Sequence, residues 1–301
     1  MKSAKNSHIK YMVANTADEL WGLYVTTIGF QSILPNSNYP PKGHPSAYWY
    51  NPDKGRILHE YQIIYITKGE GEFRSASCGT STVTAGNVLL LFPEEWHTYK
   101  PLKKTGWEAY WIGFKGDSIE KIIGNNFFSK ENPVLDIGFN EQVTAVFKQG
   151  IEVANFQKTA YQPMMAGFTH MLLSFIYYSE KNNSFRDKEI ISKIDQARLL
   201  MRDEMYYNES PEKIAAQLNI SYSWFRRVFK HYTGFSPNQY QMEIKIQKAK
   251  ELLASTTMPI KEITYDLNFE SVSYFITFFK LKVGLSPNEY RKKVHSPNVD
   301  E

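Results

Sequence analysis

The stretch LNISYSWFRRVFKHYTGFSPNQY, at residues 218–240, decides the fold of this end of the chain because its pattern returns 50 residues later. The second copy lies within residues 267–290. The pairs that are identical at this offset are Ser221 and Ser271, Ser223 and Ser273, Phe225 and Phe275, Phe229 and Phe279, Lys230 and Lys280, Gly234 and Gly284, Ser236 and Ser286, Pro237 and Pro287, Asn238 and Asn288, and Tyr240 and Tyr290. Ten matches at one offset indicate an internal repeat.

Each copy predicts a helix, a tight turn and a second helix. Apolar residues with helical spacing precede the turn, at Ile214 and Leu218 in the first copy and at Ile263 and Leu267 in the second. In a helix-turn-helix, the first helix braces against the DNA backbone and the second lies in the major groove with polar side chains outward. The same arrangement also occurs as plain core architecture. A single copy would leave both interpretations open, whereas two copies favour DNA binding.

A long helix is expected between the copies, because Met242, Ile246, Ala249 and Leu253 recur at helical spacing. Such a helix would hold the two units in a fixed relation. At a separation of about 34 Å, one turn of DNA, both second helices would enter successive major grooves on one face of the duplex. From Ile190 onward no β-rich run interrupts this helical pattern.

The first part of the chain has a different character. Four β-rich runs, EYQIIYI, KGEGEF, TSTVTAGNVLLLFPEEWHTY and GWEAYWIGF, lie within residues 57–114 and are separated by turn signals. Gly69 and Gly71 suit a hairpin between the first two runs. Short strands at this spacing predict a small antiparallel barrel or sandwich.

Two amphipathic helices are expected to follow the strands. Their apolar residues are Val143, Phe147, Ile151 and Ala154 in the first, and Met164, Phe168, Met171 and Phe175 in the second. A polar stretch around residues 180–184 then resembles a linker. We therefore expect an α+β protein with a β-barrel domain and flanking helices over residues 1–180, a linker at 181–189 and an all-α domain at 190–295.

Composition limits the function without deciding it. The 301 residues carry a formal net charge of +4 and a pI near 8.8, which is less basic than an obvious nucleic-acid-binding domain. The single cysteine, Cys78, excludes an internal disulfide, a thiolate metal site and a two-thiol redox pair, and gives little support to alkyl-transfer DNA repair. Without an apolar run of about 20 residues or a leader, a cytoplasmic protein with no membrane partner is expected.

The repeat resembles the DNA-binding domain of the AraC/XylS family of bacterial regulators over residues 190–293. The resemblance implies a DNA-binding transcription regulator in which both second helices contact double-stranded DNA. The matching candidate contacts are Ser221, Ser223, Arg226, Arg227 and Lys230 in the first copy, and Val272, Ser273, Thr277 and Lys280 in the second.

Arginine can bind guanine O6 and N7 with two hydrogen bonds, so Arg226 and Arg227 are the best candidates for base recognition. Thr277 stands where the family commonly has arginine. We therefore assign more sequence specificity to the first unit and mainly phosphate contacts, through Lys280, to the second. The alternative for Lys230 and Lys280 is that both are solvated charges near helix ends.

The β-rich segment resembles the cupin-like effector domain of many AraC-type regulators through EYQIIYITKGEGEF, AGNVLLLFPEEWHTY and WEAYWIGF. That resemblance implies a small-molecule effector such as a sugar, with Arg56, Tyr99, Trp111 and His97 as candidate ligand contacts. Ala109 stands where sugar-responsive relatives use a histidine, which puts the same ligand in doubt. The alternatives are that the aromatic residues are plain core and that the regulator works without a ligand.

A cupin enzyme is the rival interpretation of this domain. His97 stands alone in EWHTY, and His59 and Glu60 do not complete the spacing of a metal site. We therefore expect no enzyme activity, no metal and no cofactor. The family resemblance further implies a homodimer, formed through the helices around residues 143–177, and contact with the transcription machinery. The competing account is that these helices pack only on their own barrel.

Overall fold

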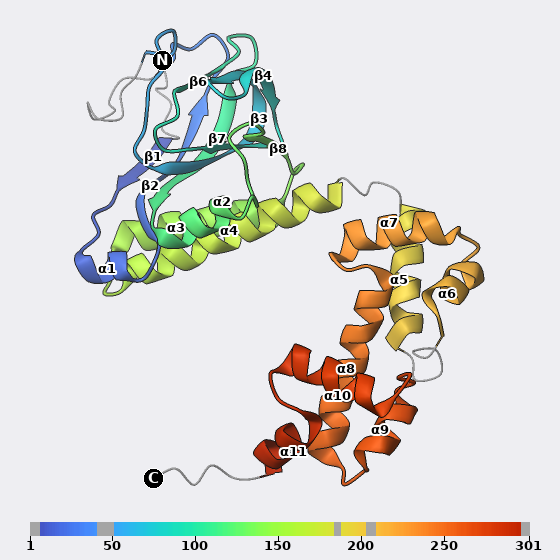
Figure 1. The fold of residues 1–301 in the computed structure, drawn as a ribbon. Helices are drawn as coiled ribbons and strands as arrows, with labels where there is room; N and C mark the ends of the chain where they lie inside the picture. Colours follow the sequence, from blue (N-terminus) through green and yellow to red (C-terminus); the bar gives the residue numbers. More distant parts are fainter. Residues whose placement is uncertain (1–6, 41–50, 184–187, 203–208, 296–301) are drawn as a thin grey trace. The chain divides into compact units, whose positions relative to one another are not determined.

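One long strand, β3 (Tyr61–Ser75), organises the first of the two units into which the chain divides (Figure 1). The computed structural model describes residues 7–40, 51–183, 188–202 and 209–295. The division between the units falls between residues 186 and 187. Each unit is considered by itself below.

The described strands of the first unit all pair antiparallel. The other strands are β1 (Ser7–Tyr11), β2 (Tyr24–Ile33), β4 (Gly79–Thr84), β5 (Asn87–Leu91), β6 (His97–Pro101), β7 (Trp107–Lys115) and β8 (Val134–Asp136). The main sheet has the order β1-β2-β7-β3-β5-β8. The first half of β3 pairs with β7 and β5, whereas its second half pairs with β4 and β6. Because β3 belongs to both groups of strands, it joins them into one barrel.

The bend that allows this double membership lies at Gly69. Its φ is +83°, and the pairing of β3 with β7 slips in register between Ile66 and Lys68. A Cβ at position 69 would stand 2.1 Å from the carbonyl oxygen of Gly106, so only glycine fits there. The expected hairpin at Gly69 and Gly71 is therefore wrong. Both glycines lie inside β3, and the chain turns at residues 76–78.

Alternate residues of β3 serve two different cores. Tyr61, Ile63 and Tyr65 pack toward the helices α3 (Glu141–Phe156) and α4 (Tyr161–Asn183), which cover the outer face of the sheet (Figure 1). Ile64 and Ile66 belong to a second cluster inside the barrel. The short helices α1 (Thr16–Leu20) and α2 (Asp117–Gly124) complete the unit.

Helix α4 buries a different stripe from the expected one. Its buried face holds Met165, Phe168, Leu172 and Ile176, together with neighbouring small and apolar residues. Met164 and Met171 are 53% and 48% exposed. The predicted helix is present, but only Phe168 of the four expected apolar positions is buried.

The second unit is all helical. Its helices are α5 (Lys188–Arg202), α6 (Pro211–Gln217), α7 (Tyr222–Thr233), α8 (Pro237–Ser255), α9 (Ile260–Asp266), α10 (Val272–Val283) and α11 (Pro287–His295). The two predicted helix-turn-helix units are α6 with α7 and α9 with α10, and the long helix α8 joins them. The expected fold class is therefore confirmed: a barrel with flanking helices, followed by a helical domain with two such units.

Two details qualify the expected boundaries. Helix α4 continues to Asn183 and α5 begins at Lys188, so both ends of the expected linker are helical, and residues 184–187 lie outside the described part. Among the residues that the structure describes, no helix has the length and apolar character needed to cross a membrane.

Candidate nucleic-acid interface and barrel interior

Helix α7 separates packing residues from polar ones. Phe225 and Phe229 are fully buried and meet edge to face, with ring centroids 5.2 Å apart. Ser223, Arg226 and Arg227 are exposed on the rest of the helix. This side of α7 is therefore available to a duplex, and the arginines carry donors that suit base edges or phosphates.

Helix α10 repeats this packing with different exposed residues. Phe275 and Phe279 are fully buried, with ring centroids 5.7 Å apart. Ser273 and Thr277 are exposed, and Val272 at the first helical position is half-buried. The buried phenylalanines thus fix both second helices in the same way.

The two lysines of the repeat, Lys230 and Lys280, are both exposed in the last turns of α7 and α10. The serines at the helix starts differ. The Ser271 hydroxyl accepts a hydrogen bond from the Tyr274 backbone N–H at 3.2 Å, whereas Ser221 makes no capping bond through its side chain. Ser221 therefore keeps its hydroxyl for another donor or acceptor.

The turns also repeat. Asn219 and Asn268 both adopt left-handed conformations, with φ of 54° and 51°. Asparagine tolerates this conformation better than most residues. Asn268 therefore gives the second turn the same conformation as the first.

One face of helix α8 contacts both helix-turn-helix units. Gln241 donates a hydrogen bond from Nε2 to the carbonyl of Glu209, before α6, at 2.5 Å. One turn later, Lys245 donates from Nζ to the carbonyl of Asn268 at 3.0 Å. Both side chains are buried, and burial lowers the pKa of Lys245. These two contacts help to hold α7 and α10, the two reading helices, in a fixed relation.

The barrel brings together three of the four candidate ligand residues. Arg56 Nη2 donates a hydrogen bond to the Tyr99 hydroxyl at 2.8 Å, and the guanidinium carbon lies 5.7 Å from the centre of the Tyr99 ring. The His97 and Tyr99 rings are parallel, with centroids 6.2 Å apart. The fourth residue, Trp111, borders the same inner apolar cluster as Tyr99. Its ring covers Gly29, where a Cβ would stand 2.5 Å from Trp111 Cζ2.

His97 is a neutral, buried side chain. Its Nδ1–H donates to the carbonyl of Glu95 at 3.0 Å, and its Nε2 has no hydrogen-bond partner among the described residues. Burial and the nearby charge of Arg56 lower the pKa of His97 to about 4. Its Nε2 is therefore an acceptor at neutral pH.

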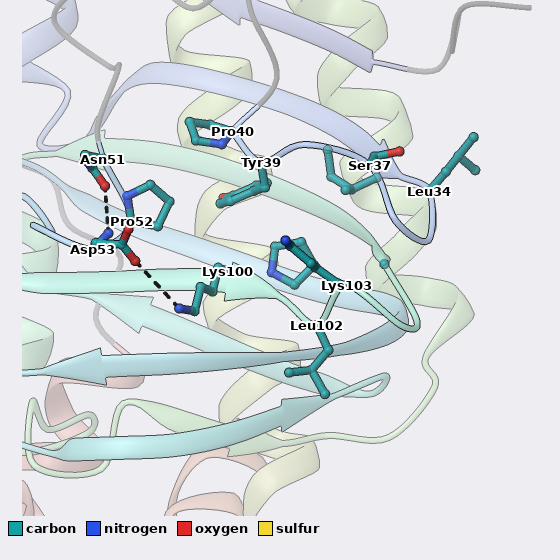
Figure 2. Close-up of a pocket in the computed structure, with 13 residues that line it drawn as sticks. Leu34, Ser37, Tyr39, Pro40, Asn51, Pro52, Asp53, Lys100, Leu102 and Lys103 are labelled. Carbon is teal, nitrogen blue, oxygen red and sulfur yellow. Dashed lines mark hydrogen bonds and ion pairs between the residues drawn. The ribbon is translucent and has the colours of Figure 1, made fainter. Parts of the chain in front are cut away.

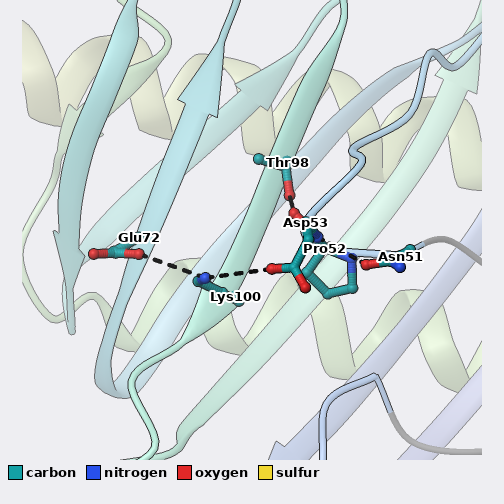
Figure 3. A network of polar contacts seen from close by, with 6 residues as sticks. All are labelled: Asn51, Pro52, Asp53, Glu72, Thr98 and Lys100. Atoms are coloured by element: carbon teal, nitrogen blue, oxygen red, sulfur yellow. Dashed lines mark hydrogen bonds and ion pairs between the residues drawn. The ribbon is translucent and has the colours of Figure 1, made fainter.

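A polar network holds the segment before Arg56 against β6 (Figure 3). The Thr98 hydroxyl donates to the carbonyl of Pro52 at 2.5 Å, and Lys100 Nζ lies 3.9 Å from an Asp53 carboxylate oxygen. The backbones of Arg56 and His97 exchange two hydrogen bonds, at 2.9 and 3.0 Å. These contacts place the Arg56 guanidinium over Tyr99.

A pocket of about 630 Å³ lies where β6 ends and β7 begins (Figure 2). Residues 51–53 border it on one side and Leu34 and Ser37 on the other, with Tyr39 and Lys103 also contributing. The Tyr39 ring meets the edge of the buried Trp107 at 6.0 Å between centroids. The pocket is therefore at the rim of the barrel, next to the inner apolar cluster.

Sequence reasoning missed a carboxylate on the inner face. Glu60 is buried, and its two oxygens accept hydrogen bonds from the Thr26 hydroxyl at 2.6 Å and from Gln62 Nε2 at 2.7 Å. A Cβ at position 113 would stand 2.5 Å from a Glu60 oxygen and 2.6 Å from Thr27 Oγ1. Gly113 therefore leaves the room that this polar group occupies.

Two further polar side chains lie near this group. Thr27 is 1% exposed, and its hydroxyl has no hydrogen-bond partner among the described residues. Burial raises the pKa of Tyr11. The nearby charge of Arg56 lowers this pKa, and that of Glu60 raises it. The only sequence signal for these residues is that Glu60 and Gln62 alternate with apolar residues that face the helices.

Within the described ranges, no group of three or more His, Cys, Asp or Glu side chains could hold a metal ion. His59 instead contacts Glu94, and both side chains are largely exposed.

Comparison with protein families agrees with both halves of this description. A profile for an AraC-like ligand-binding domain matches residues 47–163, and a profile for a helix-turn-helix domain matches residues 214–293. The chain belongs to the AraC/XylS family. Like other AraC/XylS regulators, it joins an effector-domain fold to a DNA-binding domain, and it is a DNA-binding transcription regulator.

Three relatives illustrate the family. The Msm operon regulatory protein of Streptococcus mutans is 24% identical, over 71% of this chain and 77% of its own length. The MmsAB operon regulatory protein of Pseudomonas aeruginosa is 25% identical, over 72% of this chain and 70% of its own. The lactose operon transcription activator of Staphylococcus xylosus is 25% identical, over 76% of this chain and 81% of its own.

Proposed function

We propose that this AraC/XylS regulator binds a neutral, hydroxyl-rich molecule such as a sugar inside its barrel, and that the ligand controls its occupancy of DNA. The observation that carries the proposal is the presence of two polar pairs on the inner face, the half-buried Arg56 with Tyr99 and the buried Glu60 with Gln62. A sugar site needs aromatic faces and a few fixed hydrogen-bonding groups. Trp111 supplies an aromatic face, and His97 Nε2 supplies an acceptor.

The relative that is named as a lactose operon activator supports a sugar effector. A panel of mono- and disaccharides in a thermal-shift assay tests the idea, because a ligand at 100 times its Kd adds about 2.7 kcal/mol to stability. The Tyr99→Phe variant, which loses the hydroxyl that accepts from Arg56, should bind the same sugar more weakly. If no sugar shifts the transition, the regulator without a ligand is favoured.

We infer that the DNA contacts come from both reading helices. Ser223, Arg226 and Arg227 would contact bases from α7, and Val272, Ser273 and Thr277 would lie in the groove from α10. Ser221, Lys230 and Lys280 would bind phosphates. Their exposure supports this assignment, apart from Val272, which is half-buried.

Arg226→Ala and Arg227→Ala test the assignment directly. Each should weaken specific binding by about 1 to 3 kcal/mol, because each would remove a two-bond contact with guanine. Lys193→Ala on α5 is a matched control, since it removes one positive charge outside both helix-turn-helix units. Unchanged affinity in both arginine variants would contradict the assignment.

We also propose that the regulator forms a homodimer through α4. Met164, Met171 and Tyr178 are spaced seven residues apart and are 53%, 48% and 67% exposed. Apolar residues at heptad spacing are typical of paired helices. This stripe is separate from the face that α4 packs on its own barrel.

Sedimentation measures the dimer. Met171→Glu should shift the chain toward monomer, whereas Gln149→Glu, an exposed change on α3, should not. A dimer that persists in Met171→Glu would contradict this interface.

We further propose that the regulator acts at the chromosome in the bacterial cytoplasm, where it would contact the transcription machinery. We assign it no catalytic role.

A further inference from the structure

The two reading helices carry charged side chains in α7 and uncharged side chains in α10 at two equivalent positions. At the offset of 50 residues, Arg226 of α7 corresponds to Ile276 of α10, and Arg227 corresponds to Thr277. Both helices are 12 residues long and end at a left-handed glycine. The two helices thus share their length, their C-terminal turn and their buried phenylalanines, while the exposed side chains at these two positions differ.

The substituted positions are accessible. Ile276 is 36% exposed, and Thr277 is exposed with it, while Phe275 and Phe279 are fully buried on the other side of α10. Neither Ile276 nor Thr277 is a residue of the apolar core beneath the helix. Two methyl-bearing side chains therefore stand where the first unit presents its arginines.

The charge on the two faces differs accordingly. Helix α7 presents Arg226, Arg227 and Lys230, whereas the corresponding positions of α10 leave only Lys280 charged. The nearby Lys282 is held by an ion pair with Glu243 of α8. Guanine O6 and N7 are hydrogen-bond acceptors, and at these two positions Ile276 has no donor and Thr277 has a single hydroxyl, so neither can form the two-bond contact of an arginine.

Thymine is the base that suits this face. Its C5 methyl group projects into the major groove, and apolar side chains and the threonine methyl are the groups that contact it. We propose that α10 reads thymine methyl groups through Ile276 and Thr277. The operator then has two unlike half-sites, one with guanines read by α7 and one with thymines read by α10. This inference rests on the proposed DNA contacts of α7.

The test starts from duplexes that the full chain selects from a random pool. The half-site whose guanine preference is lost in Arg226→Ala and Arg227→Ala belongs to α7. Thymines in the other half-site are then replaced with deoxyuridine, which removes only the C5 methyl. Each contacted methyl should account for about a fourfold loss of affinity. The same replacement in the α7 half-site is the control and should change affinity less than twofold.

Protein variants complete the cycle. Ile276→Ala and Thr277→Ser remove methyl groups from the protein, and Thr277→Ser keeps the hydroxyl. Each should weaken binding to the thymine duplex about fourfold but should have no further effect on the deoxyuridine duplex. Because both side chains are exposed, circular dichroism should show a native helical content in both variants.

Three results would overturn the inference. If guanine reading persists but deoxyuridine binds as well as thymine, the methyl contact is wrong while the proposed function stands. If both variants bind all duplexes normally, this face does not read bases and is open to a protein partner instead. If no duplex is selected at all, the proposed function fails, and this inference fails with it.

Discussion

Lys245 donates a hydrogen bond from Nζ to the backbone carbonyl of Asn268, 3.0 Å away, and so ties the connecting helix α8 to the turn of the second helix-turn-helix unit. The same ammonium group lies 5.5 Å from the centre of the Phe269 ring. Asn268 is in the left-handed conformation that reverses the chain between α9 and α10. One buried cation thus satisfies a carbonyl at the tightest point of the reading unit.

Lys245→Met should destabilise the second helix-turn-helix unit by about 1 to 3 kcal/mol. The apolar side chain fills the space but leaves the Asn268 carbonyl without its donor. Thermal unfolding of the full chain, followed by circular dichroism, measures the change. Lys261→Met is the control, because Lys261 is exposed on α9. An equal, small effect in both variants would mean that the buried contact contributes nothing.

The buried His97 predicts a pH dependence of the barrel. Its pKa is lowered to about 4 in the folded chain, from 6.5 for the free side chain. Between these values the unfolded chain takes up a proton that the native barrel excludes. The contribution of neutral His97 to the free energy of unfolding is therefore complete above pH 6.5 and is lost as the pH falls toward 4. At pH 5 the loss is about 2 kcal/mol.

Urea unfolding at pH 7 and pH 5, followed by tryptophan fluorescence, would show this loss. Five of the six tryptophans, at positions 21, 49, 96, 107 and 111, belong to the first unit. His97→Gln, which cannot titrate, should be less sensitive to pH than the natural chain. Parallel curves for the two proteins would show that His97 is not the titrating group.

Gly113→Ala should damage the inner polar group without touching the apolar core. The added Cβ would meet Glu60 Oε1 at 2.5 Å and Thr27 Oγ1 at 2.6 Å, so the carboxylate must move. Overpacking of this kind costs about 1 to 3 kcal/mol of stability. Thermal unfolding measures this cost. The affinity for a sugar found by thermal shift should also fall. An equal loss of affinity in Glu60→Gln would show that the displaced carboxylate is the cause.

Lys230→Ala and Lys280→Ala separate phosphate contacts from solvated charges. Each phosphate contact contributes about 0.9 to the slope of log affinity against log salt concentration, so each variant should flatten the slope by that amount. The affinity for all sequences should fall together, because phosphates carry no sequence information. An unchanged slope would identify the lysine as a solvated charge. Lys193→Ala provides the baseline.

The helical domain could be predicted in detail because its signal is local. Ten identities at one offset and a stripe of helical spacing specify the packing residues, and Phe225, Phe229, Phe275 and Phe279 are all fully buried. What the repeat could not supply is the role of α8 in joining the units. Lys245 has the sequence context of a surface lysine, and only the packing around it shows that it is buried.

The barrel was harder to predict, for a physical reason. All residues from Tyr61 to Ile66 are buried, because helices cover one face of β3 and the barrel interior covers the other. A strand that is covered on both sides is largely apolar on both faces, so the alternation of Glu60 and Gln62 with apolar residues ends after Gln62. The sequence therefore does not mark Glu60 as an inner polar residue, and the glycines inside the continuous strand resemble a hairpin.

The helical domain contains two separate small cores, one built around Phe225 and Phe229 and the other around Phe275 and Phe279. Because each reading helix rests on its own core, substitutions on one outer face leave the support of the other intact. The duplicated module is therefore free to diverge. One copy can acquire a new base preference by point substitution while its twin keeps the old one, so new operators arise in halves, and a reading face can be grafted from one relative to another.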